Sequence, residues 1–425
     1  MKIKYLLYGL AGILAVLLPI ILLPVDDELD AEAAAWLQRA NDSQDTESNG
    51  YYFLTGIIAA PEEDPLTAGR AIHEAYLQAE RKFLNGELKF GEFMKHEYYP
   101  PGRQLPEPEG DYYCRLREAG CFKRLANNPA VLRDELKTHA VLLERYLRYR
   151  RFEFIKKLAQ PAMHEPFFSY GHILRGQKLL QFRIILDNLS ANREGALRLL
   201  HEDIRHTRRH LAASFTLIDK MINLNRLAED LDLLFEIEQP GASRESVPPL
   251  TAQERSLEAA MVNEFGSISN YLKHLDHYSE SEDSTLYSAL TVATLKPNMS
   301  LNALLPYYRA VSALSLADAT EFSRAVETGL PKMEIGFNLR NIGGWAFTDY
   351  DSPSLTEYSG RLHDVDCKIT LINGVLAGKG TDIANPYDPE QRPHLDKATQ
   401  ALCFDGPLPD DLQRRCVRKD ADLRL

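Results

Sequence analysis

The densest group of side chains able to do chemistry lies in HEDIRHTRRH, residues 201–210. His206 and His210 follow Asp203 by three and seven positions, a spacing that places all three on one face of a helix. Two imidazoles and a carboxylate on one face can bind a divalent metal ion. The three arginines of the segment would repel a cation, and the HExxH pattern of zinc proteases is absent. The alternatives are a solvated basic face or a site for an anionic ligand.

A second group consists of carboxylates that crowd the end of the next helical segment. Its members are Glu229, Asp230, Asp232, Glu236 and Glu238. Two carboxylates can carry out glycoside hydrolysis, one as the acid and one as the base or nucleophile. The chain has 61 acidic residues, however, and spacing alone selects no pair among them. The alternative interpretation is a solvated acidic helix face.

The cysteines are candidates for bridges, metal ligands or reactive thiols. They are Cys114, Cys121, Cys367, Cys403 and Cys416. Outside the cytoplasm disulfides persist, and the economical pairing is Cys114 with Cys121 and Cys403 with Cys416. A zinc site is disfavoured because the first pair lacks the short spacing of zinc ligands. A reactive pair is the other alternative, since neighbouring cations would lower the pKa of a thiol.

A bridge between Cys114 and Cys121 makes a structural demand. Seven helical positions span about 10 Å along the axis, whereas disulfide-bonded Cα atoms lie within about 7 Å of each other. The chain must therefore turn between the two cysteines, and Gly120 is the expected position. Cys367 lies on an apolar helical stripe, which predicts a buried thiol; the alternative is a nucleophile.

The compartment follows from the amino-terminal segment. Residues 5–24 form a run of twenty residues without a charge, long enough as a helix to span roughly 30 Å of hydrocarbon. Two lysines in residues 1–4 precede the run, and four carboxylates follow it within residues 25–30. This asymmetry predicts a single-pass inner-membrane helix with a cytoplasmic tip and a periplasmic body. A cleaved signal peptide is the alternative, and it would export the same body.

The remaining chain predicts a mainly α-helical protein, an irregular multi-helix bundle with a small loop and β-hairpin cap. We expect a juxtamembrane stalk over 25–50 that begins with a short helix, and a helical domain over 51–350, with a further boundary at the linker 240–249. A C-terminal helix and a disulfide-stapled cap would occupy 351–425. The expected helices are 66–84, 128–152, 165–189, 192–238 with a break near Ala213–Ser214, 250–275, 300–327 and 354–378.

Two segments are expected to lack regular structure. Residues 97–113 hold four prolines and two tyrosine pairs, which predicts a stiffened loop over the helical body. The alternative is that the loop presents its aromatic side chains to a partner. Residues 336–353 are also expected to form a loop, with Gly343, Gly344 and Trp345 as a turn before an aromatic anchor.

Composition excludes some classes of function. The net charge is −12 and the pI about 5.6, with no dominant basic footprint, so nucleic acid is not an expected partner. The same acidic balance argues against a body held on anionic lipid by charge. Charged residues make up 26% and hydrophobic residues 44% of the chain, which is ordinary for a globular protein.

Four stretches carry a resemblance to a known family, together with the pair Cys114 and Cys121. They are NGYYFLTGIIAAPEEDPLTAGR, LLHEDIRHTRRHLAASFTLIDKMI, GRLHDVDCKITLI and NPYDPEQRPHLDKATQALCF. The chain resembles proteobacterial single-pass inner-membrane proteins with a periplasmic helical domain. No activity is assigned to that family, so the resemblance implies an architecture and a compartment but no site residues.

The function that these features favour is an envelope interaction or scaffold protein, whose helical surface binds another envelope protein and which needs no cofactor. The alternative is a periplasmic hydrolase or metal-dependent enzyme that uses the 203–210 face or the 229–238 carboxylates. The two readings differ in geometry. An enzyme predicts a deep pocket where these polar groups converge, and a scaffold predicts that they are dispersed.

Overall fold

The computed structural model describes residues 25–166, 168–238, 246–278, 291–348 and 354–418. The first part of the chain forms α2 (Ala31–Asn41), α3 (Tyr51–Thr55), α4 (Pro65–Leu84), α5 (Phe90–Phe93), α6 (Cys121–Ala126), α7 (Pro129–Thr138), α8 (Ala140–Tyr149), α9 (Tyr170–Leu189), α10 (Arg193–Ala213) and α11 (Leu217–Ile237). The second part forms α12 (Ala252–Arg255), α13 (Glu258–Lys273), α14 (Leu275–Tyr278), α16 (Pro297–Leu316), α17 (Ala319–Thr328), α18 (Ile342–Thr348), α19 (Thr356–Leu376), β1 (His394–Asp396), β2 (Ala401–Cys403) and β3 (Cys416–Val417). The prediction of a mainly helical fold is confirmed.

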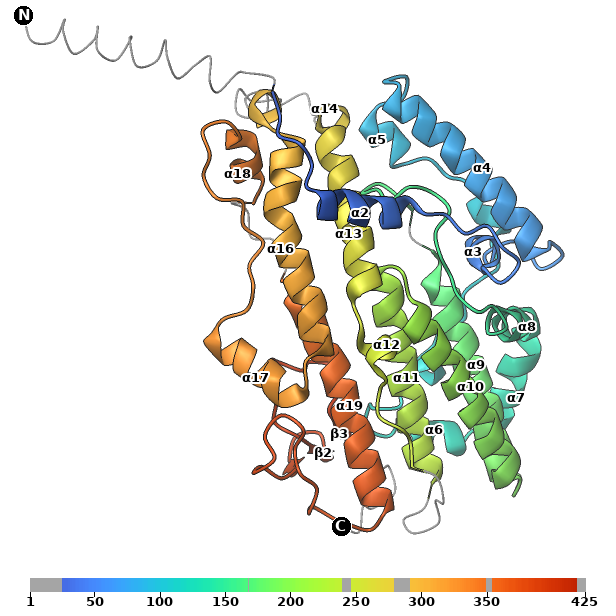
Figure 1. Ribbon diagram of the computed structural model, residues 1–425. Coiled ribbons are helices and arrows are strands. Elements are labelled where there is room, and N and C mark those ends of the chain that lie inside the picture. Colours follow the sequence, from blue (N-terminus) through green and yellow to red (C-terminus); the bar gives the residue numbers. More distant parts are fainter. Residues whose placement is uncertain (1–24, 167, 239–245, 279–290, 349–353, 419–425) are drawn as a thin grey trace, which may run out of the picture.

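The long helices pack around a shared core. α9, α10 and α11 contact one another, α13 packs on α16, and α19 packs on both α11 and α16 (Figure 1). One hydrophobic cluster of buried residues runs from Ala33 to Val417. Helix α11 lies at the centre of this arrangement and buries nearly all of its residues, its charged ones included.

Among the described residues, no helix has both the length and the apolar character to cross a bilayer. The predicted cytoplasmic tip at 1–4 and the predicted transmembrane helix at 5–24 lie outside those residues. The described part of the linker, 246–249, is held on α19, because Val247 N–H donates to the side chain of Asn373 at 2.9 Å.

The short helix predicted within the stalk over 25–50 is present as α2, but it packs on the bundle instead of standing apart from it. Ala33, Trp36, Leu37 and Ala40 of α2 are buried against α13 and α16, and the ring of Trp36 meets that of Phe265 edge-on at 6.0 Å. These four positions follow the helical spacing of an apolar stripe, and burying the stripe removes it from water. α2 is therefore part of the bundle.

Some predicted helix boundaries agree with the structure and others differ; the single helix expected over 300–327, for example, is divided into α16 and α17. The break near Ala213–Ser214 is confirmed, since α10 ends at Ala213 and α11 begins at Leu217. The helix expected over 128–152 is divided at His139 into α7 and α8. The helix expected from residue 165 begins only at Tyr170, so Glu165 lies before the helix and not within it.

The predicted loop over 336–353 contains a helix. α18 begins after Asn341, whose side chain accepts from the N–H of Gly344 at 3.1 Å, and asparagine is among the preferred residues for this capping position. Gly343 and Gly344 are therefore helical residues, and the turn expected there is wrong.

The C-terminal cap is a three-stranded antiparallel sheet in the order β1–β2–β3, so the hairpin predicted around Leu402 to Phe404 is confirmed within a slightly larger sheet. Leu402 pairs with Val417, and Cys403 pairs with Cys416. The sheet packs on α19, which itself belongs to the main bundle. The C-terminal segment thus shares the core of the helical body.

Candidate functional site

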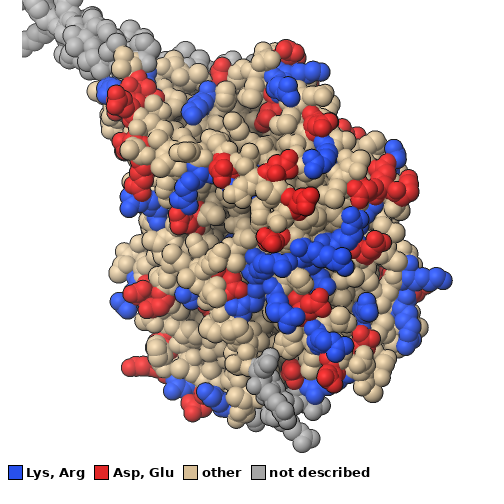
Figure 2. Space-filling model, turned by 45° about the vertical axis from the view of Figure 1, so that its right-hand side comes forward, with Lys and Arg blue, Asp and Glu red and all other residues tan. Residues whose placement is uncertain are grey.

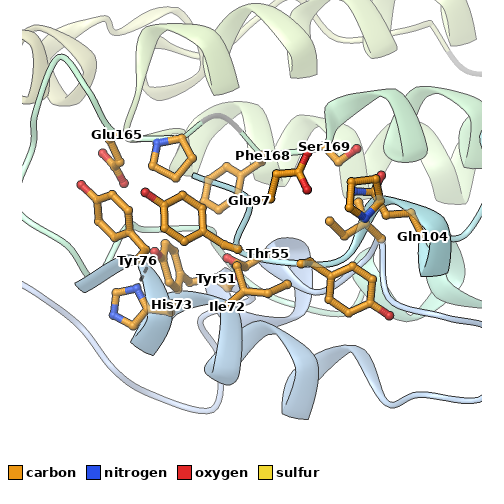
Figure 3. Close-up of a pocket in the computed structure, with 15 residues that line it drawn as sticks. Tyr51, Thr55, Ile72, His73, Tyr76, Glu97, Gln104, Glu165, Phe168 and Ser169 are labelled. Carbon is orange, nitrogen blue, oxygen red and sulfur yellow. Dashed lines mark hydrogen bonds between the residues drawn. The ribbon is translucent and has the colours of Figure 1, made fainter. Parts of the chain in front are cut away.

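An apolar cavity of about 260 Å³ lies where α3 and α4 meet two loops, one at 97–104 and one just before α9. Figure 3 shows Glu165, Tyr76 and His73 at one end of the cavity, Ser169 and Gln104 at the other, and Phe168 and Tyr51 between them. The lining residues are Tyr51, Thr55, Ile58, Ile72, His73, Tyr76, Glu97, Tyr98, Tyr99, Pro101, Gln104, Glu165, Pro166, Phe168 and Ser169.

Close packing of α3 on α4 positions the cavity floor. A Cβ atom at Gly56 would lie 2.0 Å from the carbonyl oxygen of Pro65, and one at Gly69 would lie 1.8 Å from that of Tyr52. Only glycine fits at both positions, so the two helices approach each other backbone to backbone. The hydroxyl of Tyr51 thereby comes within 2.9 Å of Nδ1 of His73.

The proline-rich loop forms one wall and is fastened to the connection between α3 and α4. Tyr99 accepts from the N–H of Ala60 at 2.8 Å and donates to Glu63 at 2.7 Å. Leu105 N–H donates to the carbonyl of Ile58 at 2.8 Å. The loop over the helical body is thus confirmed, and its first tyrosine pair, Tyr98 and Tyr99, lines the cavity, with Tyr98 edge-on to Tyr76 at 5.6 Å.

Glu165 supplies a buried ionisable carboxyl group to the lining of the cavity. Its side chain is 8% exposed, and Lys157 Nζ donates to one of its two carboxylate oxygens at 2.6 Å. Burial raises the pKa of Glu165 to about 7, although Lys157 opposes that shift. The carboxyl group therefore changes protonation near neutral pH, and it can donate or accept a hydrogen bond depending on that state.

A buried polar chain lies behind the aromatic wall. Tyr76 donates to Glu80 at 2.6 Å, and Nε2 of His164 lies 3.0 Å from the same oxygen. The other ring nitrogen of His164 bonds to the hydroxyl of Tyr278. Burial lowers the pKa of His73, so its imidazole is neutral beside Tyr51 at pH 7. These bonds fix the rings of Tyr51 and Tyr76 that face the cavity.

Asp203, His206 and His210 lie on one helix, as predicted, but each side chain bonds to a different partner and the three do not converge on one point. Asp203 is buried and accepts from Tyr146 at 2.9 Å and from Arg150 at 3.0 Å. Nε2 of His210 lies 2.8 Å from the carbonyl of Phe152, and burial lowers the pKa of His210 to about 3. Half-buried His206 lies beside Arg209. Across the described residues, no three His, Cys, Asp or Glu side chains group as a metal site.

The interpretation of 229–238 as a solvated acidic face is wrong. All five carboxylates are buried. Their partners include Lys178 at 3.5 Å and Arg117 at 3.9 Å for Glu229, Gln181 at 3.0 Å for Asp230, Lys368 for Asp232, and Arg193 at 2.9 Å for Glu238. These basic and amide groups come from other helices and, for Arg117, from a turn far away in the sequence, so the local pattern could not reveal them. Glu229 also lines a polar cavity of about 490 Å³ beside the bridge of Cys114 and Cys121.

The predicted disulfides are both present. Cys114 and Cys121 are bonded with their Cα atoms 6.0 Å apart, and Cys403 is bonded to Cys416. The expected turn lies at Gly120, which has a φ of 75°, in the left-handed region that favours glycine. Cys367 is a free, buried thiol, as its apolar stripe predicts.

Sequence reasoning missed His73 and Glu165 as members of a site. Glu165 follows a histidine and precedes a Pro-Phe-Phe stretch, and a charged residue in such surroundings is the signal that could have indicated burial. Tyr98 and Tyr99, one of the tyrosine pairs noted in the sequence, line the cavity; presentation of these side chains to a partner stays a prediction. No family model, curated protein or solved structure matches the chain, so the resemblance to a membrane-anchored family stays a prediction.

Proposed function

We propose that this protein is an envelope binding protein, anchored in the inner membrane by residues 5–24, whose periplasmic body takes an apolar group bearing an amine into the cavity between α3 and α4. The group would belong to another envelope component. The observation that carries the proposal is the buried carboxyl group of Glu165 at one end of a cavity walled by aromatic rings.

Two features of the cavity favour an amine over an acid or a neutral group. The faces of Tyr51, Tyr76 and Phe168 suit the apolar body of a ligand, and the π-systems of such rings attract cations. Glu165 adds a negative charge when ionised, with one oxygen bonded by Lys157. A protonated amine at this end would stabilise the carboxylate, because an opposite charge favours the charged form.

The proposed compartment is supported by covalent structure. The two bridges, Cys114–Cys121 and Cys403–Cys416, belong to the part of the chain that follows the apolar run. Disulfides form and persist outside the reducing cytoplasm. The apolar run and its flanking charges supply the proposed anchor.

Binding is tested with three probes of one chain length: hexylamine, hexanol and hexanoate. The full chain in lipid nanodiscs is titrated with each probe by isothermal calorimetry. We expect hexylamine to bind most tightly and hexanoate most weakly. The affinity for hexylamine should also rise as the pH increases through about 7, where Glu165 ionises.

The variants decide whether Glu165 is responsible. Glu165→Gln should bind hexylamine and hexanol about equally, whereas Glu92→Gln, which changes an exposed carboxylate on α5, should keep the wild-type preference. A wild-type protein that binds hexanoate as well as hexylamine, or that binds none of the three probes, contradicts the proposal. The anchor is tested separately by extraction of membranes with alkaline carbonate, which releases peripheral proteins only.

A further inference from the structure

Several exposed apolar side chains gather at one end of the molecule. Phe337 is 64% exposed, Leu339 39% and Trp345 36%, and the rings of Phe337 and Trp345 meet edge-on at 5.5 Å. Val25, the first described residue, is 60% exposed, and its carbonyl oxygen accepts a hydrogen bond at 3.5 Å from Nη2 of Arg340, the residue that follows Leu339. We name Val25, Phe337, Leu339 and Trp345 the α18 patch.

The α18 patch is fixed rigidly to the start of α16. Asn341 is almost fully buried, and its side-chain oxygen accepts from the N–H of Lys296 at 2.9 Å. Its side-chain nitrogen donates to Ser300 at 2.9 Å, and the same side chain caps α18. Buried, satisfied polar contacts of this kind specify one geometry, so α18 has a defined position on α16.

The beginning of the described chain is fastened to the same helix end. The carboxylate of Asp26 accepts from the N–H groups of Asn298 at 2.7 Å and Met299 at 3.1 Å, which lie in the first turn of α16. A carboxylate at this position satisfies free N–H groups and interacts favourably with the helix dipole. Arg340 bonds to Asp27 at 2.8 Å. In Figure 1 the first described residues (blue) and α18 both lie near the upper end of α16.

We infer that the α18 patch contacts the headgroup boundary of the phospholipid bilayer that holds residues 5–24. This inference rests on the proposed anchor. The apolar run ends immediately before Val25, and one residue spans at most about 3.6 Å, so Val25 lies at the membrane surface. The contacts of Asp26 and Arg340 then place Trp345 and Phe337 at the same level. Tryptophan is enriched at this boundary because its ring is apolar and its N–H is polar.

The contact is apolar in character. The carboxylate of Asp26 bonds to the N-terminus of α16, and that of Asp27 bonds to Arg340. The patch itself is made of aliphatic and aromatic side chains. Burial of such surface does not depend on an ionic partner, so zwitterionic lipid should suffice. Because ionic screening acts on charged contacts only, high salt should leave the contact unchanged.

The two tryptophans of the chain provide a direct test. Trp345 lies in the α18 patch, and Trp36 is 7% exposed in the core between α2 and α13. The full-length variant Trp36→Phe, which retains Trp345 alone, is reconstituted in phosphatidylcholine nanodiscs with and without bromine on the acyl chains. We expect brominated lipid to quench the fluorescence of Trp345 strongly and aqueous acrylamide to quench it weakly, at low and at high salt.

The matched control is the full-length variant Trp345→Phe, whose remaining Trp36 should be insensitive to brominated lipid. Strong quenching of Trp345 by acrylamide but not by bromine would show a patch facing water and overturn the inference. Protection from both quenchers would show a protein cover, either residues 5–24 or a partner, and would overturn it as well. Carbonate extraction of cell membranes that contain the same variant tests the proposed anchor separately from the lipid contact. If the protein stays in the membrane but brominated lipid does not quench Trp345, the lipid contact is refuted and the proposed anchor is not.

Discussion

Ionisable side chains are buried both in the core between α9, α10 and α11 and in the cavity between α3 and α4. The two regions differ in the partners that surround these side chains. In the core, Arg226 donates to the hydroxyl of Tyr146 at 2.7 Å, Tyr146 donates to Asp203, and Arg150 donates to the other side of the same carboxylate group. In the cavity, Glu165 has Lys157 as its bonded partner and lines an open volume.

Burial and a shifted pKa do not distinguish a site from a structural network. Burial raises the pKa of Asp219 in the core to about 6, much as it raises that of Glu165 in the cavity to about 7. The difference lies in what faces each group. Asp219 is bonded to Asn223 of its own helix, whereas Glu165 faces a space that a ligand can enter. Shifted pKa values occur in both settings, so geometry must decide between them.

The largest effect is expected from breaking the core network at Arg226. Arg226→Met removes the partner of Tyr146 and Asn223 and leaves the carboxylate of Asp203 with less compensation. Removal of one member of a buried charged network typically costs about 3–5 kcal/mol. We expect a loss of that size in the free energy of unfolding, measured by urea denaturation of the full chain in detergent with circular dichroism.

The matched control is Arg205→Met on the exposed face of α10, which should change the free energy of unfolding by about 0.5 kcal/mol or less. If Arg226→Met proved as mild as its control, the network would contribute little to stability, and the contrast between core and cavity would lose its basis.

A smaller effect, confined to a pH range, is expected at Glu165. Its pKa is raised from 4.5 in the reference state to about 7 in the folded protein, so the folded state binds the proton more tightly than the unfolded state. The resulting stabilisation is complete below about pH 4.5 and is lost as the pH rises through about 7. Between about pH 5 and about pH 8, the wild type should lose roughly 2 kcal/mol more than Glu165→Gln.

This prediction is checked by urea unfolding of both proteins across that pH range, with Glu92→Gln as the control that keeps the wild-type slope. Parallel pH profiles for the wild type and Glu165→Gln would mean that Glu165 ionises normally and that the cavity does not desolvate it.

The sequence was sufficient for those features that depend on local spacing. The turn at Gly120 followed from the reach of a disulfide, and the break near Ala213 followed from the helical pattern. The stripe of α2 was equally local, but the charges around it suggested a stalk. Hydrophobic spacing indicates that a face is buried, whereas it does not identify the helix that covers it.

The features that could not be predicted depend on distant partners. Asp232 is paired with Lys368, which lies 136 positions away on α19, so its helix looks acidic and solvated when read alone. Glu165 is similar, because its raised pKa depends on burial under α4 and the proline-rich loop. The tyrosine pairs could be recognised from the sequence as part of a loop over the helical body, whereas the burial of the Glu165 carboxyl group in a cavity could not.

The smallest effect comes from making the same chemical change in both regions. Tyr146→Phe removes a hydroxyl that accepts from Arg226 and donates to Asp203, and hydrogen bonds to charged groups contribute about 1.5–3 kcal/mol. Tyr51→Phe removes a hydroxyl bonded to His73, a neutral pair that contributes about 1 kcal/mol. The difference between the two variants in the free energy of unfolding should therefore be about 1 kcal/mol.

The ligand measurement gives the same pair of variants a second readout. Tyr51→Phe should alter hexylamine binding measurably, because it removes a hydroxyl group and its bond to His73 from the cavity lining, whereas Tyr146→Phe should leave it unchanged, because Tyr146 lies in the core. A core variant that weakens hexylamine binding as much as the cavity variant would mean that the two regions act as one unit. If Tyr51→Phe destabilised the protein more than Tyr146→Phe, the roles assigned to the two regions would be reversed. The cavity would then contribute more to the stability of the fold than the charged network of the core.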